Sequence, residues 1–298
     1  MAVKISLGPV LYFWSADKLR EFYREIAGSS VDIVYLGETI CSKRRSLTLA
    51  EWIEIGEELQ SAGKEVVLST LALLEAESEL KSLKRICNNG KFMVEANDMA
   101  AVQILSSQSI PFVVGHSINL YNQRTISVLA KHSMRRWVAP VELSKYTIKE
   151  LHQSKPEGVE SELFVWGRIP LSYAARCYTA RHYDLPKDEC QYKCIEDPDG
   201  ILLETKENEE FLTINGIQTQ SAQSCNLLPH LEDIADIGID IVRISPQSSA
   251  TLSIIELFNR ARSNQISIDE RIVAAKPFLH YGGVDGYWMG KAGMKREI

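Results

Sequence analysis

The amino-acid sequence predicts an α/β fold, a (β/α)8 TIM-like barrel with a cysteine-bearing insertion after strand 7 and an irregular C-terminal arm. Two observations predict it. Short apolar runs alternate with amphipathic runs through most of the 298 residues, as expected for strands that are buried on both faces of a parallel sheet. The alternation gives eight strand–helix units, and eight units favour a closed barrel over a doubly wound sheet.

The expected strands are short, nearly all apolar and separated by helices. They are Val3–Phe13, Val31–Leu36, Glu65–Leu68, Lys91–Glu95, Pro111–Val114, Arg136–Val141, Leu163–Trp166 and Ile239–Ile244. Runs with this composition are typical of a parallel sheet whose two faces are both covered.

The expected helices alternate with those strands and carry helix-end signals. They are Asp17–Ile26, Thr48–Ala62, Glu75–Cys87, Met99–Ser106, Gln123–Lys131, a helix containing Ile148–His152, Leu231–Ile237 and Thr251–Arg262. The second helix stops at Gly63, and the third ends at Asn88-Asn89-Gly90, a left-handed cap signal.

We expect residues 1–298 to form one barrel domain with two irregular parts. The alternation breaks over 168–230, which contains most of the cysteines and an expected hairpin of Ile201–Thr205 and Phe211–Ile214. The tail, 277–298, is rich in glycine and aromatic residues and has no helix or strand pattern. Large aromatic side chains are costly to leave in water, so we expect an ordered arm or a partner contact there.

Composition excludes several classes of protein. The chain is 45% hydrophobic and 24% charged, which is ordinary globular composition. Its net charge of −6 disfavours broad binding to nucleic acid or anionic membranes. No apolar stretch approaches the roughly 20 residues that cross a bilayer, and the N-terminus lacks a leader pattern. We therefore expect a cytoplasmic protein, whose six cysteines stay reduced.

Common catalytic and nucleotide-binding motifs are missing from the sequence. No Gly-x-Gly-x-x-Gly follows a strand, and neither a Walker A motif, Gly-x-Ser-x-Gly nor His-Glu-x-x-His is present. Nucleotide-binding and common hydrolase functions therefore have no support.

The cysteines form the most informative pattern. Cys177, Cys190 and Cys194 place three thiols within eighteen residues of an irregular segment, which suits a soft metal. The spacing fits a zinc knuckle poorly, and Asp197 stands where a radical-SAM pattern would need a third cysteine. A four-iron cluster needs one more thiolate, and Cys41 follows the second strand on the face where barrel active sites form. Unconnected buried thiols remain the alternative.

The two remaining cysteines have weaker signals. Cys87 lies at the end of an expected helix and is expected to pack in the core. The role of Cys225 stays open.

Cationic residues adjoin the proposed ligands. Lys43, Arg44 and Arg45 follow Cys41 and could tune a cluster or hold an anion such as a dicarboxylate, or they could form a solvated turn. Arg168 and Arg176 flank the end of the seventh strand, and one of them could face the cluster.

Polar residues after the fifth and sixth strands are candidates for the barrel mouth. His116, Asn119 and Asn122 follow the fifth strand, although Asn119 could equally cap a turn. Glu142 follows the sixth strand and could act as acid or base, or pair with Lys145. His116, Glu142 and Arg176 are therefore the catalytic candidates.

Six segments, taken in order and spacing, resemble the peptidase U32 family over nearly the whole chain. They are GETICSKRR, HSINLYNQRT, APVELS, WGRIPLSYAARCY, DECQYKC and GYWMGKAG. The common family pattern has cysteines at the positions of Pro170 and Asn226, whereas Cys41 and Cys190 are extra. The resemblance therefore implies a [4Fe–4S] cluster held by Cys41, Cys177, Cys190 and Cys194, with Cys225 a bystander.

The resemblance is closest to members that act in oxygen-independent ubiquinone biosynthesis. It implies a heterodimer with a UbiU-like protein that hydroxylates quinone precursors, with prephenate as the anionic oxygen donor. Two alternatives remain, a non-catalytic iron–sulfur partner of a catalytic UbiU-like subunit and an RNA-hydroxylating enzyme. Peptidase activity is not expected, because the chain has no nucleophile elbow and no zinc motif.

Overall fold

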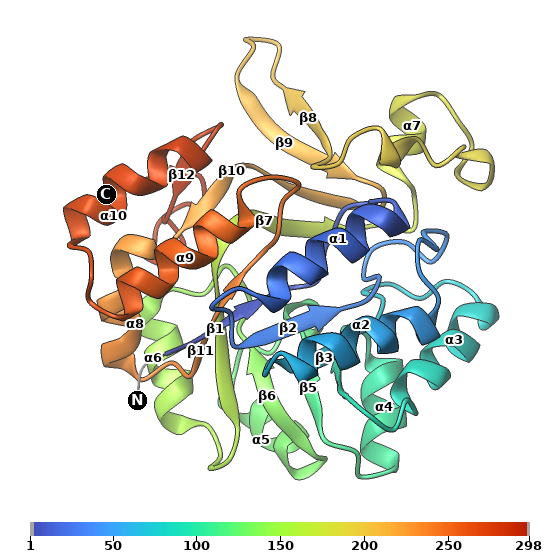
Figure 1. Ribbon diagram of the computed structural model, residues 1–298, viewed down its shortest axis with the longest axis horizontal. Coiled ribbons are helices and arrows are strands. Elements are labelled where there is room, and N and C mark those ends of the chain that lie inside the picture. Colours follow the sequence, from blue (N-terminus) through green and yellow to red (C-terminus); the bar gives the residue numbers. More distant parts are fainter. Residues whose placement is uncertain (1–2, 297–298) are drawn as a thin grey trace.

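The computed structural model describes residues 3–296, and in it a parallel barrel is closed by eight strands (Figure 1). β11 pairs with both β7 and β1, which closes the ring and confirms the predicted fold class. The barrel strands are β1 (Lys4–Leu7), β2 (Ile33–Leu36), β3 (Glu65–Ser69), β4 (Met93–Ala96), β5 (Phe112–Val114), β6 (Met134–Val138), β7 (Glu160–Tyr173) and β11 (Ile241–Ile244). The outermost residues of the expected domain and arm, 1–2 and 297–298, lie outside the described part.

Helices surround the barrel, and most begin at a polar cap. They are α1 (Ala16–Ala27), α2 (Leu49–Ser61), α3 (Glu77–Cys87), α4 (Met99–Ser107), α5 (Gln123–Lys131), α6 (Lys145–Ser154), α8 (Leu231–Ile237), α9 (Thr251–Arg262) and α10 (Ile268–Ala275). Thr48, for example, starts α2 with a reciprocal capping box to Glu51. α10 was not predicted, although Ser267 and Glu270 form a capping box there. Within 3–296, no helix is long and apolar enough to cross a membrane.

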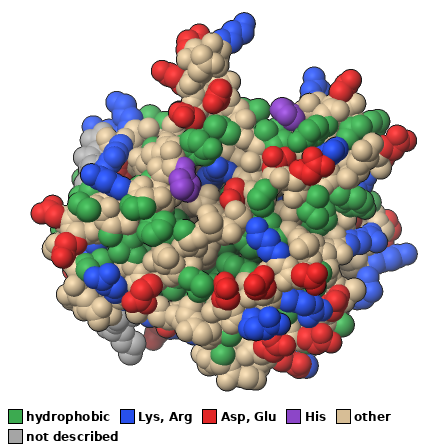
Figure 2. Space-filling model, turned by 45° about the horizontal axis from the view of Figure 1, so that its top comes forward, with side chains coloured by type: hydrophobic (Ala, Val, Ile, Leu, Met, Phe, Trp, Pro, Cys, Tyr) green, Lys and Arg blue, Asp and Glu red, His purple; other side chains and the backbone are tan. Residues whose placement is uncertain are grey.

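The insertion extends the barrel sheet outward. β7 runs far beyond the barrel and pairs antiparallel with β10 (Gln218–Asn226), which pairs with β9 (Glu210–Asn215) and through it with β8 (Ile201–Glu204). The expected hairpin is therefore present, and it projects from the body of the molecule (Figures 1 and 2). β10 was missed because QTQSAQSCN lacks an apolar pattern, although most of it is buried.

One strand prediction was too long. The first strand ends at Leu7 rather than at Phe13. Residues 8–14 leave the sheet and form a buried loop over the barrel mouth. Leu11 packs against Ile217 of the insertion and Trp14 donates to the Pro198 carbonyl, while Val10, Tyr12 and Trp14 belong to the main core. Burial outside a sheet therefore produced the strand-like pattern.

A buried ion-pair network fills the barrel together with apolar side chains. Arg243 donates from Nη1 to Glu95 Oε1 and from Nε to Glu162 Oε1, both at 2.7 Å. Its guanidinium lies 4.0 Å from the ring centroid of Tyr35, whose hydroxyl donates to Glu162. Arg136 donates to the same hydroxyl at 3.1 Å. We call these five residues the barrel ion core.

The C-terminal arm folds back onto the barrel and is ordered through 277–296. Trp288 is buried, and its carbonyl accepts from Lys145 N at 2.9 Å. Asp285 pairs with His230 at 2.8 Å, while β12 (Gly283–Val284) pairs with β10. Tyr281 stays exposed, unlike the arm's tryptophan.

Candidate metal centre

The structure brings the four predicted ligand cysteines together at the carboxyl end of the barrel. Cys41 lies in the loop after β2, whereas Cys177, Cys190 and Cys194 lie in the insertion, and all four are half-buried. The thiols are near enough to influence one another electrostatically in three pairs: Cys41 with Cys177, Cys177 with Cys194, and Cys194 with Cys190. Two segments far apart in sequence therefore meet through their thiols.

The thiols do not form a ready-made site for a single ion. Within residues 3–296, no group of three or more His, Cys, Asp or Glu side chains has the spacing of ligands around one metal. Thiolates on the corners of an iron–sulfur cube stand farther apart than the ligands of one ion. Four thiols at half-buried positions are the donor set that a [4Fe–4S] cluster takes, so the residues present fit such a cluster.

A tight loop holds Cys41 in place. Glu38 Oε1 accepts from the backbone N–H groups of Ile40 at 2.8 Å and of Cys41 at 3.0 Å. Gly37 has φ +123, and a Cβ there would come within 2.7 Å of the Ser69 carbonyl oxygen. The β2 strand can therefore turn sharply and present Cys41 toward the insertion.

The turn between β9 and β10 fixes the segment that carries Cys177. The Gly216 carbonyl accepts from Tyr178 N at 2.7 Å, and Gly216 N donates to Thr179 Oγ1 at 2.9 Å. Both partners lie in α7 (Tyr178–His182), which Cys177 caps by accepting from Ala180 N at 3.4 Å. Asn-Gly at the turn is a strong hairpin signal, and here it also anchors a proposed ligand.

The backbone between Cys190 and Cys194 turns back on itself. Gln191 (φ 50) and Tyr192 (φ 56) are both left-handed, which costs roughly 1–2 kcal/mol per residue. After this reversal Cys190 is near enough to Cys194 to influence that thiol electrostatically. An ion pair then ties the segment to the other loop, since Lys43 Nζ lies 2.8 Å from Asp188 Oδ1.

Arg44 is a buried cation whose charge acts on the Cys41 and Cys194 thiols. It is only 4% exposed, and it donates to the Leu11 carbonyl at 2.9 Å and to Asn215 Oδ1 at 2.7 Å. Its Nε has no hydrogen-bond partner among the described residues. Burial raises the pKa of the Cys41 and Cys194 thiols, and the Arg44 charge opposes that shift. A buried donor therefore remains for an anionic sulfur ligand.

A small cavity of about 20 Å³ opens in the barrel mouth beside this site. His116 lies there, 3.2 Å from the Tyr173 hydroxyl. Burial, with the Arg243 charge, lowers the pKa of His116 to about 4, so its imidazole is neutral at physiological pH. Thr39 Oγ1 and Arg243 Nη2 also line the cavity region and lack partners among residues 3–296.

The other predicted polar residues lie away from the thiols or are engaged elsewhere. Glu142 accepts from the Tyr121 hydroxyl, not from Lys145, which pairs with Asp233. Asn122 caps α5, as its Oδ1 accepts from Thr125 N.

Arg168, Arg176 and Asn119, which were also candidates for the site, make contacts elsewhere or are exposed. Arg168 donates to the Asp199 carbonyl, and Arg176 is exposed next to Cys177. Asn119 is left-handed after a short helical turn, the capping role that the sequence left open.

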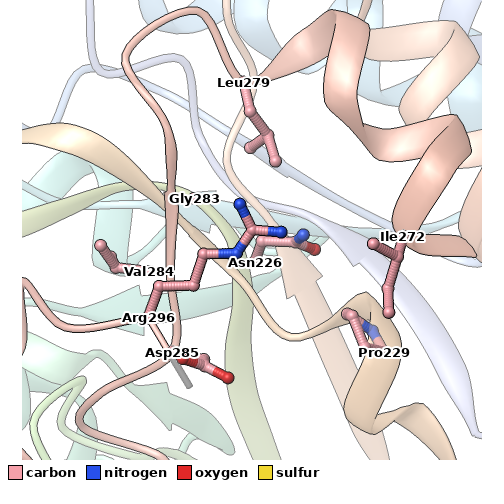
Figure 3. A pocket seen from close by; sticks show the side chains of 8 residues that line it. All are labelled: Asn226, Pro229, Ile272, Leu279, Gly283, Val284, Asp285 and Arg296. Atoms are coloured by element: carbon pink, nitrogen blue, oxygen red, sulfur yellow. The ribbon is translucent and has the colours of Figure 1, made fainter. Parts of the chain in front are cut away.

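Cys87 and Cys225 are separate from the four-thiol site. Cys87 is 2% exposed and packs in the core, as expected. Cys225 is buried in β10 next to β12, and the charge that affects its thiol is that of Asp285. Figure 3 shows the neighbouring Asn226 in a small pocket with arm residues such as Gly283 and Arg296, with no cysteine among the labelled side chains.

Sequence reasoning missed the barrel ion core. Glu95 and Arg243 each stand in a strand that is otherwise apolar, whereas Arg136 follows Arg135 and Glu162 directly precedes the expected strand Leu163–Trp166. A charged residue within a strand that is buried on both faces was the available signal, because such a charge needs a buried partner. No pairing could be assigned without the barrel.

Comparison with known proteins shows the family of this chain and gives two solved structures to which it is distantly similar. A solved structure of the U32 peptidase Mk0906 aligns at a TM-score of 0.46 with 10% identity, covering 83% of this chain and 94% of that one. Dihydropteroate synthase from Thermus thermophilus aligns at 0.39 with 11% identity, covering 86% and 94%. The peptidase family U32 model matches residues 14–266, most of the chain. The chain therefore belongs to peptidase family U32.

Proposed function

We propose that this chain is a UbiV-like subunit of an oxygen-independent hydroxylase that acts on ubiquinone precursors. In this proposal Cys41, Cys177, Cys190 and Cys194 hold a [4Fe–4S] cluster. The chain works in the cytoplasm as a heterodimer with a UbiU-like protein, and prephenate is the oxygen donor. The observation that carries the proposal is the meeting of four half-buried thiols from two distant segments at the carboxyl end of a U32 barrel.

The surroundings of the thiols support a redox role rather than hydrolysis. A bound cluster supplies electron transfer or polarisation of an oxygen donor. Arg44 would offset the negative charge of the thiolates, and its unpartnered Nε would donate toward them. The pKa of its guanidinium is lowered by burial but raised overall by Glu38, Cys194 and Cys41, so the cation persists.

The barrel mouth supplies an uncharged hydrogen-bonding pair, His116 and Tyr173. Tyr173 and Cys177 both pack against the small apolar cluster of Leu11, Ile40 and Ile217. His116 is neutral and lies 3.2 Å from the Tyr173 hydroxyl, so this pair can orient a polar group by hydrogen bonds. Because a pKa near 4 makes the imidazole a weak base, we assign His116 a positioning role, and Glu142 is engaged by Tyr121.

A non-catalytic role is the second candidate, and one observation favours it. The mouth cavity, at about 20 Å³, holds little more than a water molecule. The aromatic substrate would then lie in the partner subunit, and the cluster of this chain would only stabilise its fold.

The experiment is anaerobic complementation of a strain that lacks this gene, with the UbiU-like partner present. Cys41→Ala is expected to abolish anaerobic ubiquinone formation, whereas the matched Cys225→Ala retains it. Iron content and partner binding are measured on the same purified variants. Full quinone formation by an iron-free Cys41→Ala protein that still binds its partner would reject a catalytic cluster and favour the second candidate.

A further inference from the structure

An open groove lies between α2 and α3, beside the loop of residues 37–48 that joins β2 to α2 and carries Cys41, here called the cysteine loop. The two helices are at the right of Figure 1. α2 packs against α1, and α3 packs against α4, so the helix ring parts between the two pairs. The groove has a volume of about 550 Å³, within the range of small-molecule sites. Its floor is formed by the ends of β2 and β3.

Most of the groove wall is apolar. Leu47, Leu49, Trp52, Leu71 and Ile86 line it, contributed by the cysteine loop, both helices and the segment after β3. An apolar groove of this size binds a hydrophobic group of a small molecule more readily than a polar group.

Three cations stand at the groove without an acidic partner. Arg45, Lys81 and Arg85 line it and are exposed, and none forms an ion pair within residues 3–296. Lys81 and Arg85 are four residues apart on α3, a like-charge spacing that destabilises a helix slightly. Three neighbouring cations without acidic partners attract an anion, which would neutralise their charge.

The acidic residues of the groove are already engaged. Glu38 accepts two backbone N–H groups of the cysteine loop. Glu79 accepts from Ser42 Oγ and from the backbone N–H groups of Glu75 and Ala76. The three cations therefore remain the groups available to a ligand.

We infer that this groove binds a small amphiphile with an apolar body and an anionic head group, a carboxylate or phosphate. The body lies on the leucine and tryptophan wall, and the head group meets Arg45, Lys81 and Arg85. Because Glu38, Ser42 and Arg44 line the groove and belong to the cysteine loop, the ligand lies beside the thiols. The inference goes beyond the proposed function and does not depend on iron binding.

The test is titration of the full-length protein with sodium octanoate, followed by calorimetry and by tryptophan fluorescence. The neutral 1-octanol and the cationic octyltrimethylammonium serve as matched probes. Octanoate is expected to bind at least about tenfold more tightly than octanol, and octyltrimethylammonium more weakly than both. Equal affinity for all three probes would overturn the anionic half of the inference.

Variants on one exposed helix locate the site. Lys81→Glu with Arg85→Glu is expected to weaken octanoate binding at least about tenfold, whereas Lys84→Glu, on the same helix but off the groove, leaves it unchanged. Ser82→Trp, which fills the groove, is expected to abolish binding, while Ser82→Ala retains it. Octanoate binding that survives Ser82→Trp overturns the site.

Vesicles of phosphatidylglycerol separate a free ligand from a membrane surface. The inference predicts octanoate binding without co-flotation of the protein with vesicles. Co-flotation that the Lys81→Glu, Arg85→Glu variant loses, without octanoate binding by the wild type, would overturn it in favour of a lipid surface. Weaker binding of the UbiU-like partner by the same variant, again without octanoate binding, would overturn it in favour of a protein contact.

Discussion

The barrel ion core and the four-thiol site are polar regions of opposite construction. In the core, Arg243 stands on a regular strand, is 4% exposed and has two carboxylate partners at 2.7 Å. The thiols stand on loops and strained turns, are half-buried, and influence one another electrostatically. The charges of the core are paired with protein groups, although Arg243 Nη2 has no partner among residues 3–296, whereas the four thiols have no cation paired with each of them.

This difference separates stability from function. Removing a member of the core leaves a buried charge unpaired, so the effect falls on folding. The thiol site instead resembles a binding site whose missing interactions a ligand would supply. Substitutions in the two regions should therefore change different measurements.

The largest expected effect on stability is that of Arg243→Met. It leaves Glu95 and Glu162 buried without their shared cation, which costs about 3–5 kcal/mol of unfolding free energy. Urea denaturation measures it. The matched control is Lys4→Met, whose ion pair with Glu160 is 48% and 34% exposed, and which should cost less than about 1 kcal/mol. Similar losses for both variants would mean that the core is not the stabilising element.

The second effect is a pH dependence from His116, which links the two regions. Its pKa falls to about 4 through burial and the Arg243 charge. As pH drops from about 6.5 to 4, the unfolded chain takes up a proton that the folded protein refuses. The contribution of His116 to the free energy of unfolding is therefore complete above about pH 6.5. It is lost as the pH falls toward 4, by up to about 3 kcal/mol.

Two measurements check this pH dependence. NMR titration of the imidazole should give the pKa near 4, and His116→Gln should remove this part of the decline in stability. An imidazole that titrates at its ordinary value would show that the mouth is open to water.

The smallest effect compares two glycines with positive φ. Gly63→Ala meets only backbone strain, since no atom lies within 4 Å of the added Cβ, and should cost about 1 kcal/mol. Gly216→Ala adds a clash with Arg44 Nη2, 2.8 Å away, and should cost about 2 kcal/mol. Thermal unfolding measures both. Equal costs would show that Arg44 does not need its close approach to the β9–β10 turn.

The fold was largely predictable because most barrel strands are short and mainly apolar, and their burial on two faces leaves a clear pattern. β10 and α10 were not predicted. In β10 the sequence QTQSAQSCN is polar, and it is buried only by its neighbours in the insertion. Cys41 could be predicted from its place at a strand end, and its approach to Cys177 follows from barrel geometry. The position of the Arg44 cation beside the thiols, which Arg168 and Arg176 do not share, depends on its contact with the Gly216 turn. This is a tertiary contact that no local sequence pattern encodes.

The most direct test of the four-thiol assignment is the iron and acid-labile sulfide content of protein purified without oxygen. The wild type and Cys225→Ala should each carry about four irons and four sulfides per chain. Cys41→Ala should lose most of both while remaining folded. Colourless wild-type protein without iron, or a Cys41→Ala protein with full iron content, would contradict the assignment.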